Sequence, residues 1–291
     1  MSQKNPKVSI VMPVRNAGSF VMEAVQSIQD QTFCNWELII VDDASTDNTP
    51  NIIKNLADED KRIRILRNIE RMGPSESANI AISKAGGEFI ARMDADDVSL
   101  PNRLNSQIKF LLENKKAVAV GGQCIVIDKT GKEIGKKMFP VEARDIKSMI
   151  FISVPLQQPT LMVSKSLLPK NFFWYEGALD VAEEVDLLFR LFKYGDICNL
   201  PEFVLRYRIH GENTSLKNPK RTFLLTLKTR ARAVFKYGYK PTFKGLFMTW
   251  MQFMVVLLLP NRLIYPTYAL LRGIVSIRPP FGPRFVISKD I

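Results

Sequence analysis

The stretch GEFIARMDADDVSLPNRL, residues 87–104, decides how the rest of the chain is interpreted. It opens with an apolar run over residues 88–93 that predicts a buried β-strand, and a helix is expected after the proline near its end. Asp94, Asp96 and Asp97 follow the strand directly. Carboxylates this close repel one another, so a half-buried cluster requires a cation or strong hydrogen-bond donors nearby. A divalent metal is the simplest such cation; the alternative is an ordinary helix-start turn, where Asp is also favoured.

Three more apolar runs precede this strand and alternate with helical patterns. The runs cover residues 8–13, 36–41 and 63–66, and the helices are expected within residues 20–28, 51–56 and 75–84. Continuously apolar strands separated by helices predict an α/β fold with a mostly parallel sheet covered on both faces. Ligands bind beyond the carboxyl ends of strands in such sheets, so segments 13–16, 42–43 and 94–97 are expected along one rim.

Two common phosphate-binding motifs are absent from the sequence. No GxGxxG follows the first predicted strand and no GxxxxGK[ST] occurs, which excludes a dinucleotide fingerprint and a P-loop. A sugar nucleotidyltransferase would want a glycine-rich loop where this chain reads VMPVRNAG. Phosphates would therefore be held by side chains and a metal. Mg²⁺ or Mn²⁺, hard cations that accept carboxylate and phosphate oxygens, is the expected cofactor.

Composition limits the classes of protein. The chain has 291 residues, 46% of them hydrophobic, enough for one large domain with or without an appendage. Three widely spaced cysteines predict no disulfide framework, and the polar N-terminus lacks a signal-peptide core, so the cytoplasmic side is expected. The net charge of +12 lies C-terminally, because from Pro201 onward 16 Lys and Arg accompany only 3 Asp and Glu. Charge confined in this way, without a zinc-finger, RRM or KH signature, favours a membrane surface over nucleic acid.

Four blocks occur in an order and spacing that resemble one enzyme family: VSIVMPVRNAGSF, WELIIVDDASTD, the helix around Asn79 and GEFIARMDADDVSLPNRL. They are similar to the donor half of family 2 glycosyltransferases of GT-A fold, in particular those of bacterial cell-surface polysaccharide synthesis. The resemblance implies an inverting transferase that uses a nucleotide-diphosphate sugar, with a UDP-sugar favoured. It implies a nucleotide-sugar site made of Pro13, Val14, Arg15, Asn16, Asp43, Arg71, Asp94 and Ala95.

The same resemblance assigns roles within this site. Pro13 and Arg15 would line the base pocket, and Arg71 would approach the nucleotide. Asp43 would accept a hydrogen bond from the base, the alternative being a turn-forming Asp. Asp94 would lie near the ribose and the donor sugar.

The only histidine, His210, lies in the string LRYRIHGENTS. A lone histidine usually has no role, but the family often carries Arg-x-His after its last strand, and imidazole is an acceptable ligand for Mn²⁺. The resemblance therefore implies a metal site of Asp96, Asp97 and His210. Arg206 and Arg208 are hypothesised to meet phosphate, the alternative being that they point to solvent.

A second carboxylate group, Glu183, Glu184 and Asp186, is expected at the start of a helix, because the apolar positions that follow keep helical spacing. Three acids there would also complement the helix dipole, which is the structural alternative. An inverting sugar transfer needs one carboxylate to take a proton from the acceptor hydroxyl. The family's base is an Asp, and this chain has Glu184 at that position. The extra methylene changes the reach, for which Glu183 or Asp186 would compensate.

Two further positions complete the expected acceptor site of Gln158, Trp174, Glu183 and Asp186. The block PLQQPTLMVSK resembles a family block that usually carries His where this chain has Gln158. Glutamine forms hydrogen bonds but does not titrate, so a proton-handling role is in doubt there. Trp174 opens the block that leads to the second acid group. A half-buried strand at 118–127 begins this half of the chain.

The C-terminal third combines basic and apolar segments. Residues 222–244 predict a basic helical stretch, and residues 245–259 carry no charge but are too short to span about 30 Å of hydrocarbon, which takes about 20 residues. A second apolar segment covers residues 263–277. Core helices packed on the catalytic domain are the alternative to an interfacial helix pair. Aromatic residues and basic flanks favour the interfacial pair, peripheral or monotopic on the cytoplasmic membrane face, and hence a lipid-borne acceptor.

These features predict a GT-A catalytic domain over residues 1–215 and a membrane-associating helical region over residues 216–291. Within the domain, residues 1–115 form the donor half and residues 116–215 the acceptor half. The predicted function is metal-dependent transfer of a sugar to a glycan or polyprenyl-linked acceptor. The alternatives are a polyprenyl-phosphate sugar synthase, which needs no strong base at Glu184, a sugar nucleotidyltransferase, and a non-catalytic nucleotide-binding subunit. The donor base and sugar, the linkage and the oligomeric state stay open.

Overall fold

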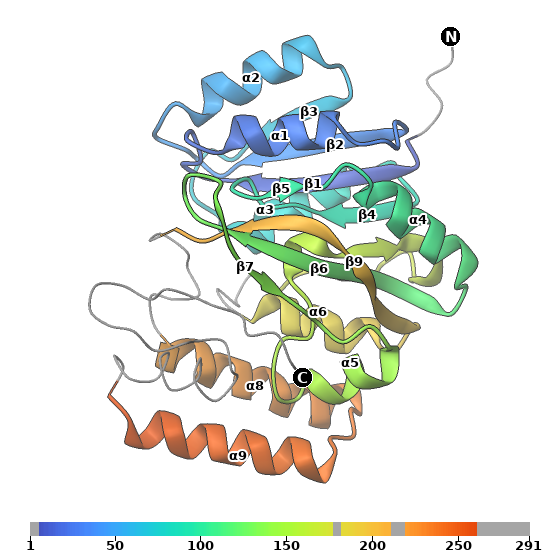
Figure 1. Cartoon of the computed structure of the whole chain (residues 1–291), viewed down its shortest axis with the longest axis vertical. Helices are drawn as coiled ribbons and strands as arrows, with labels where there is room; N and C mark the ends of the chain where they lie inside the picture. The colour runs from blue at the N-terminus through green and yellow to red at the C-terminus, as the bar shows by residue number, and fades with distance from the viewer. Residues whose placement is uncertain (1–5, 177–181, 211–218, 261–291) are drawn as a thin grey trace.

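The computed structural model describes residues 6–176, 182–210 and 219–260 and arranges them around one nine-stranded sheet (Figure 1). The strands are β1 (Val8–Val14), β2 (Trp36–Asp42), β3 (Ile63–Arg67), β4 (Phe89–Arg92), β5 (Val98–Ser99), β6 (Ala117–Ile127), β7 (Glu133–Lys137), β8 (Met162–Ser164) and β9 (Asp196–Arg208). The helices are α1 (Val21–Gln29), α2 (Thr49–Glu59), α3 (Pro74–Ser83), α4 (Arg103–Glu113), α5 (Ala143–Met149), α6 (Glu183–Leu191), α8 (Pro219–Tyr237) and α9 (Phe243–Leu258).

The donor half has the predicted parallel arrangement. The sheet runs in the order β3-β2-β1-β4-β8-β6-β9-β5, with β7 paired to β6, and its first four strands are mutually parallel. Alternate residues of β1 point to opposite faces: Ile10 and Met12 pack with α1, α2 and α4, and Val11 packs with α3. Both faces are apolar because both are covered by helices. The carboxyl ends of β1, β2 and β4 therefore meet at one edge, as expected.

The acceptor half differs from the prediction of a mostly parallel sheet. β6 and β9 are parallel, but β8 runs antiparallel to both β4 and β6, and β5 and β7 are antiparallel to β9 and β6. A short hairpin connection, such as that from β6 to β7, permits only antiparallel pairing. β8 follows β7 in the chain through α5 and the 3₁₀ turn Gln158–Thr160. It then pairs with β4 and β6 and not with β7. This short strand joins the two halves into one sheet.

The C-terminal helices form a layer outside α6, with α8 packed on α6 and α9 outermost (Figure 1). The single basic stretch expected over residues 222–244 is divided. α8 ends at Tyr237, Gly238 adopts a φ of 72°, and the Thr242 side chain caps α9 by accepting from Gly245 N at 3.0 Å. Among the described residues, no helix is both long and apolar enough to cross a membrane. The segment 263–277 and the expected domain boundary at 215 lie outside the described residues.

Candidate active site

The loops after β1 and β2 are held together at the donor end of the rim. Arg15 Nη1 donates to the carbonyl oxygen of Asp43 at 2.8 Å, and the amide of Asn16 donates to Ser45 Oγ at 2.9 Å. The turn contact considered for Asp43 is made by its neighbour instead, because Asp42 Oδ1 accepts from Ser45 N at 3.1 Å. The carboxylate of Asp43 is thereby left for other partners.

Asp43 is 4% exposed and organises the loop that carries Arg71. Its Oδ1 accepts hydrogen bonds from Asn68 Nδ2 at 2.8 Å and from Met72 N at 2.7 Å, and its Oδ2 accepts from Gly73 N at 2.9 Å. Burial raises the pKa of this carboxyl, but the hydrogen bonds outweigh burial and hold the pKa below its usual value. Asp43 is therefore ionised, and Oδ2 keeps a lone pair beyond the one that Gly73 uses.

Three predicted nucleotide-sugar residues are apolar and contribute less to the rim. The side chains of Val14 and Ala95 are 3% and 6% exposed and belong to the apolar core beneath the rim. Burial of this kind stabilises small apolar side chains, so a contact of Val14 or Ala95 with the nucleotide sugar would use backbone atoms, and their assignment to this site stays a prediction. Pro13 is half-buried, one residue before the end of β1.

The three aspartates after β4 converge as predicted. One carboxylate oxygen from each of Asp94, Asp96 and Asp97 lies within 4.8 Å of the others. His210 Nε2, beyond the end of β9, is 2.8 Å from Asp96 Oδ2. Asp97 is 1% exposed; its Oδ1 accepts from Arg208 N at 2.8 Å, and its buried Oδ2 has no hydrogen-bond partner within the described chain. Two distant segments therefore build one acidic site with an unsatisfied oxygen.

The residues of this acidic site fit a divalent cation. Burial raises the pKa of Asp97 well above its usual value, and the charges of Asp96 and Asp94 raise it further. Burial also raises the pKa of Asp94, although Arg92, whose Nη2 lies 2.8 Å from Asp94 Oδ1, opposes the rise. A cation among these carboxylates would reverse both shifts. Carboxylates with an orphaned oxygen, joined by an imidazole, are a ligand set suited to Mn²⁺.

Glu183 and Glu184, in the first turn of α6, belong to the same site. Burial raises the pKa of Glu184 to about 7, and the next largest cause is the charge of Asp94. Burial raises the pKa of Glu183 to about 8, with the charge of Glu184 as the next cause. Arg92, whose Nη2 lies 2.8 Å from Asp94 Oδ1, lines the same crevice as Glu183, so one arginine connects the two acid groups of the sequence.

Asp186 lies elsewhere, which corrects its assignment to the acceptor site. It is 1% exposed, its Oδ2 lies 2.8 Å from Arg190 Nε, and its Oδ1 accepts from Tyr237 OH at 2.8 Å. Arg232 Nη1 on α8 is 3.6 Å from Oδ1. Asp186 comes two residues after Glu184, about 200° further round the helix, so it faces α8. Its role is to fasten α8 to the helix that carries the glutamates.

The two other predicted acceptor residues have different positions. Gln158 borders a narrow crevice next to the glutamates. The crevice is lined by Pro74, Ser75, Ala78, Arg92, Gln158, Tyr175 and Glu183. Trp174 is half-buried, its ring packs edge-on against a phenylalanine, and its carbonyl accepts from Arg190 Nη2 at 2.6 Å. Gln158 thus borders the same crevice as Glu183, whereas the ring of Trp174 packs against Phe172, and the assignment of both to the acceptor site stays a prediction.

Two residues of the site, Arg92 and Lys137, were not singled out from the sequence. Arg92 is 6% exposed and stands between the two acid groups, paired with Asp94 and lining the crevice. Lys137, at the end of β7, lies with Nζ 4.0 Å from the ring centroid of Tyr207. Its charge opposes the burial-driven rise in the pKa of Glu184. A cation inside the apolar run FIAR was the available signal for Arg92, whereas Lys137 is one of 41 Lys and Arg and had none.

Comparison with known proteins agrees with this geometry. Residues 9–174 match the profile described as glycosyl transferase family 2. The putative glycosyltransferase EpsE of Bacillus subtilis is 32% identical over 222 residues, which cover 75% of this chain and 78% of EpsE. WfgD of Escherichia coli, a UDP-Glc:alpha-D-GlcNAc-diphosphoundecaprenol beta-1,3-glucosyltransferase, is 39% identical over 119 residues, 41% of this chain and 46% of WfgD.

Two solved structures share the fold. The 1–349 fragment of S. aureus TarS in complex with UDP-GlcNAc matches with a TM-score of 0.64 at 20% identity, over 79% of this chain and 67% of the fragment. The mannosyltransferase PcManGT from Pyrobaculum calidifontis, in complex with GDP-Man and Mn²⁺, matches with a TM-score of 0.59 at 17% identity, over 92% of this chain and 86% of that chain. At these identities the likeness concerns the fold alone. The match to the family profile and the identity with EpsE show that this chain belongs to glycosyltransferase family 2 and is a transferase of GT-A fold.

Proposed function

We propose that the protein is an inverting, metal-dependent glycosyltransferase of cell-surface polysaccharide synthesis. It moves a sugar from a nucleotide-diphosphate sugar, preferentially a UDP-sugar, to a hydroxyl of a lipid-linked glycan. The proposal is carried by one observation. Arg92 pairs with Asp94 of the three-aspartate cluster and lines the same crevice as Glu183, next to Glu184, whose raised pKa has the charge of Asp94 as its second cause. One acid group then serves the leaving diphosphate while the other serves the acceptor.

Glu184 is the proposed base. Its carboxylate takes the proton of the acceptor hydroxyl while that oxygen forms a bond to the anomeric carbon of the donor sugar. The bond from this carbon to the diphosphate oxygen breaks on the opposite face, and the diphosphate leaves with the electron pair. A pKa of about 7 suits this task, because a general base works best when its pKa lies near the operating pH.

Asp96, Asp97 and His210 are the proposed metal ligands. When bound, Mn²⁺ or Mg²⁺ would neutralise charge that develops on the leaving diphosphate. Asp94, held by Arg92, is proposed to face the ribose and the donor sugar. The complex of PcManGT with GDP-Man and Mn²⁺ supports a metal in this fold.

The donor is proposed to bind along the first two loops of the rim. Pro13 and Arg15 would line the base pocket, and the remaining lone pair of Asp43 would accept from the base. Asn16 and Arg71 flank this position on the two loops that Asp43 and Ser45 hold. The complex of TarS with UDP-GlcNAc and the name of WfgD support a UDP-sugar as donor. The diphosphoundecaprenol-linked acceptor named for WfgD supports a lipid-linked acceptor.

The C-terminal helices are proposed to rest on the cytoplasmic face of the membrane, because the polarity of α9 is inverted. Thr249 and Gln252 turn inward and donate to the carbonyl oxygens of Phe151 and Ile152 at 2.9 and 3.0 Å. Six apolar side chains between 50% and 86% exposed share the outer side: Phe243, Leu246, Phe247, Trp250, Leu257 and Leu258. Residues 219–260 contain eight Lys and Arg and no Asp or Glu. An apolar face beside cations suits the interface of an anionic bilayer.

The donor and the metal are tested by thermal unfolding with UDP-, GDP- and other nucleotide sugars in Mn²⁺, in Mg²⁺ and in EDTA. A donor at about one hundred times its Kd stabilises the fold by about 2.7 kcal/mol. We expect a UDP-sugar with Mn²⁺ to raise Tm by several degrees and EDTA to abolish the rise. The matched control is Asp96→Asn, which should unfold normally without ligand and lose the rise. A chain that no nucleotide sugar stabilises would refute the proposed donor site.

Membrane binding is tested by flotation with vesicles of phosphatidylcholine, with and without phosphatidylglycerol. The variant Phe247→Glu/Trp250→Glu should stay with the soluble fraction, whereas the wild type floats with anionic vesicles. The control Leu112→Glu changes a side chain of similar exposure on α4 and should float like the wild type. Equal flotation of all three proteins would contradict the proposed role of α9.

A further inference from the structure

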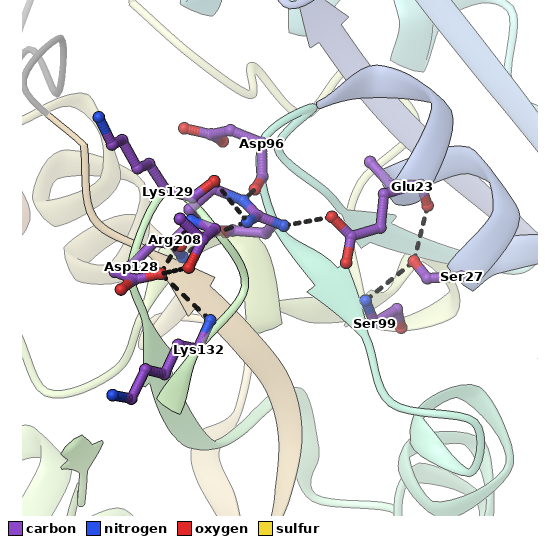
Figure 2. Close-up of polar contacts among 11 residues, drawn as sticks. Glu23, Ser27, Asp96, Ser99, Asp128, Lys129, Lys132 and Arg208 are labelled. Carbon is purple, nitrogen blue, oxygen red and sulfur yellow. Dashed lines mark hydrogen bonds and ion pairs between the residues drawn. The ribbon is translucent and has the colours of Figure 1, made fainter. Parts of the chain in front are cut away.

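Arg208, at the end of β9, is a fully buried arginine beside the acidic loop of residues 94–97 (Figure 2). Only 2% of it is exposed. Its sequence position, two residues before His210, suggested a contact with phosphate. The side chain instead turns into the protein, so its contacts there define its role.

Arg208 holds the acidic loop from two directions. Its backbone N donates to Asp97 Oδ1 at 2.8 Å, and its side-chain Nε donates to the carbonyl oxygen of Asp96 at 2.7 Å. The first contact fixes the side chain of one aspartate and the second fixes the backbone of the other. The carboxylate of Asp96, set by its backbone, then meets His210 Nε2 at 2.8 Å.

The outer nitrogens of Arg208 reach two further segments (Figure 2). Nη2 lies 2.5 Å from Glu23 Oε2 in the first turn of α1. Nη1 donates to the carbonyl oxygens of Asp128 and Lys129 at 3.3 and 3.5 Å, in the turn between β6 and β7. That turn is closed by Asp128 Oδ1, which accepts from Lys132 N at 3.1 Å. Arg208 thus joins α1 and a hairpin turn to the acidic loop.

The ring of Phe20 completes the arrangement before α1. It lies 5.0 Å from the guanidinium carbon of Arg208 and 5.3 Å from the imidazole centroid of His210. A cation over an aromatic face is attracted by the ring. The Phe20 ring therefore contacts both the guanidinium of Arg208 and the imidazole of His210. Each of the three guanidinium nitrogens of Arg208 also has an acceptor inside the protein.

We propose that Arg208 is a positioning residue that sets the acidic loop and His210 in register for a metal–diphosphate complex, and that it does not itself bind phosphate. This proposal rests on the proposed function, which supplies the metal and the diphosphate. Lysine cannot replace it, because one ammonium group cannot reach the Asp96 carbonyl, Glu23 and the hairpin turn together. Glu23 shares the role as the carboxylate that balances the buried charge.

Hydrogen exchange on the metal-free protein tests the positioning role directly. In Arg208→Lys we expect amides of residues 94–99 and 128–132 to exchange at least about tenfold faster, because hydrogen bonds to a charged group are lost at both segments. Glu23→Gln, at a side chain 53% exposed, should act in the same direction with a smaller effect and keep the fold. The control Arg62→Gln removes a distant guanidinium–carboxylate pair and should change neither segment. Rates within twofold of wild type in Glu23→Gln and Arg208→Lys would overturn the proposal.

Binding measurements separate positioning from phosphate contact. With UDP present, the apparent Mn²⁺ affinity followed by electron paramagnetic resonance should fall about 10- to 100-fold in Arg208→Lys. UDP affinity in EDTA should stay within twofold of wild type. A loss of UDP affinity in EDTA with unchanged Mn²⁺ affinity would overturn the proposal in favour of a phosphate contact. Wild-type protein that binds no Mn²⁺ would instead refute the proposed metal site, and hydrogen exchange would still decide whether Arg208 holds the loop.

Discussion

The acidic loop at residues 94–97 and the acidic helix start at residues 183–186 each place three carboxylates within four positions. In both, one carboxylate is 1% exposed: Asp97 in the loop and Asp186 in the helix. Both oxygens of Asp186 have side-chain donors, whereas Asp97 has one backbone donor and an oxygen without a hydrogen-bond partner among the described residues. The difference teaches that burial alone does not separate the structural acid Asp186 from the proposed ligand Asp97, whereas the number of satisfied oxygens distinguishes these two.

The largest expected effect concerns the acids of each group that face the site. Asp96→Asn and Glu184→Gln should each lower sugar transfer by about 10²- to 10⁴-fold, because one alters the metal site and the other lacks a base. Transfer is measured with a radiolabelled donor, and thermal unfolding checks the fold. Glu183→Gln is the matched control and should lose much less. Near-normal transfer to a glycan hydroxyl by Glu184→Gln would remove the base assignment, and activity kept on a polyprenyl phosphate would favour a synthase.

Next in size is the loss of the structural acid. Asp186→Asn should destabilise the fold by about 2–4 kcal/mol, because it leaves half-buried Arg190 facing a neutral group inside the fold. Urea unfolding followed by circular dichroism measures the loss. The control Glu88→Gln breaks an exposed ion pair with Lys7 and should cost less than about 1 kcal/mol. Equal losses in the two variants would show that Asp186 does not fasten α8.

The opposite result is expected for the buried acid of the loop. The pKa of Asp97 in the fold lies well above 3.8, so the wild-type protein loses stability as pH rises from that value through the raised pKa. Asp97→Asn does not ionise, and it should raise Tm by roughly 2–4 °C at pH 8 in EDTA and lose this advantage near pH 4. Differential scanning calorimetry at the two pH values measures the change. A lower Tm at pH 8 would place Asp97 with Asp186 as a structural acid.

The smallest expected effect is the pH dependence of kcat, which we assign to Glu184 in the acidic helix start. Protonated Glu184 cannot accept a proton, and its pKa is raised to about 7, so kcat should fall as pH drops through 7. We expect a roughly fivefold decrease between pH 7 and pH 6, measured at saturating donor and metal. Glu184→Gln should show no such limb in its residual rate. A flat wild-type profile from pH 5.5 to 8.5 would contradict the assigned base.

Local patterns explain why the donor half was predictable. Its strands are apolar runs separated by helical spacing, and Asp43 and the acidic loop follow directly after two of them, so a rule about strand ends was sufficient. The acceptor half was predicted less well, because β8 has three residues and its antiparallel neighbours depend on contacts between distant segments. Sequence spacing also suggested that Arg208 contacts a phosphate. In the fold its side chain turns inward instead, to Glu23 and the carbonyl oxygen of Asp96.

The sequence by itself determined the α/β alternation, the family, and the two places where acids gather. Only the tertiary structure decided which acid in each group faces the site, because the partners of Asp97 and Asp186 come from β9 and α8, far away along the chain. Neighbouring residues of a loop or a helix turn share the same composition but point in different directions. The desolvation and hydrogen bonding that each carboxylate meets there, and hence its charge and its chemistry, are properties of the assembled fold.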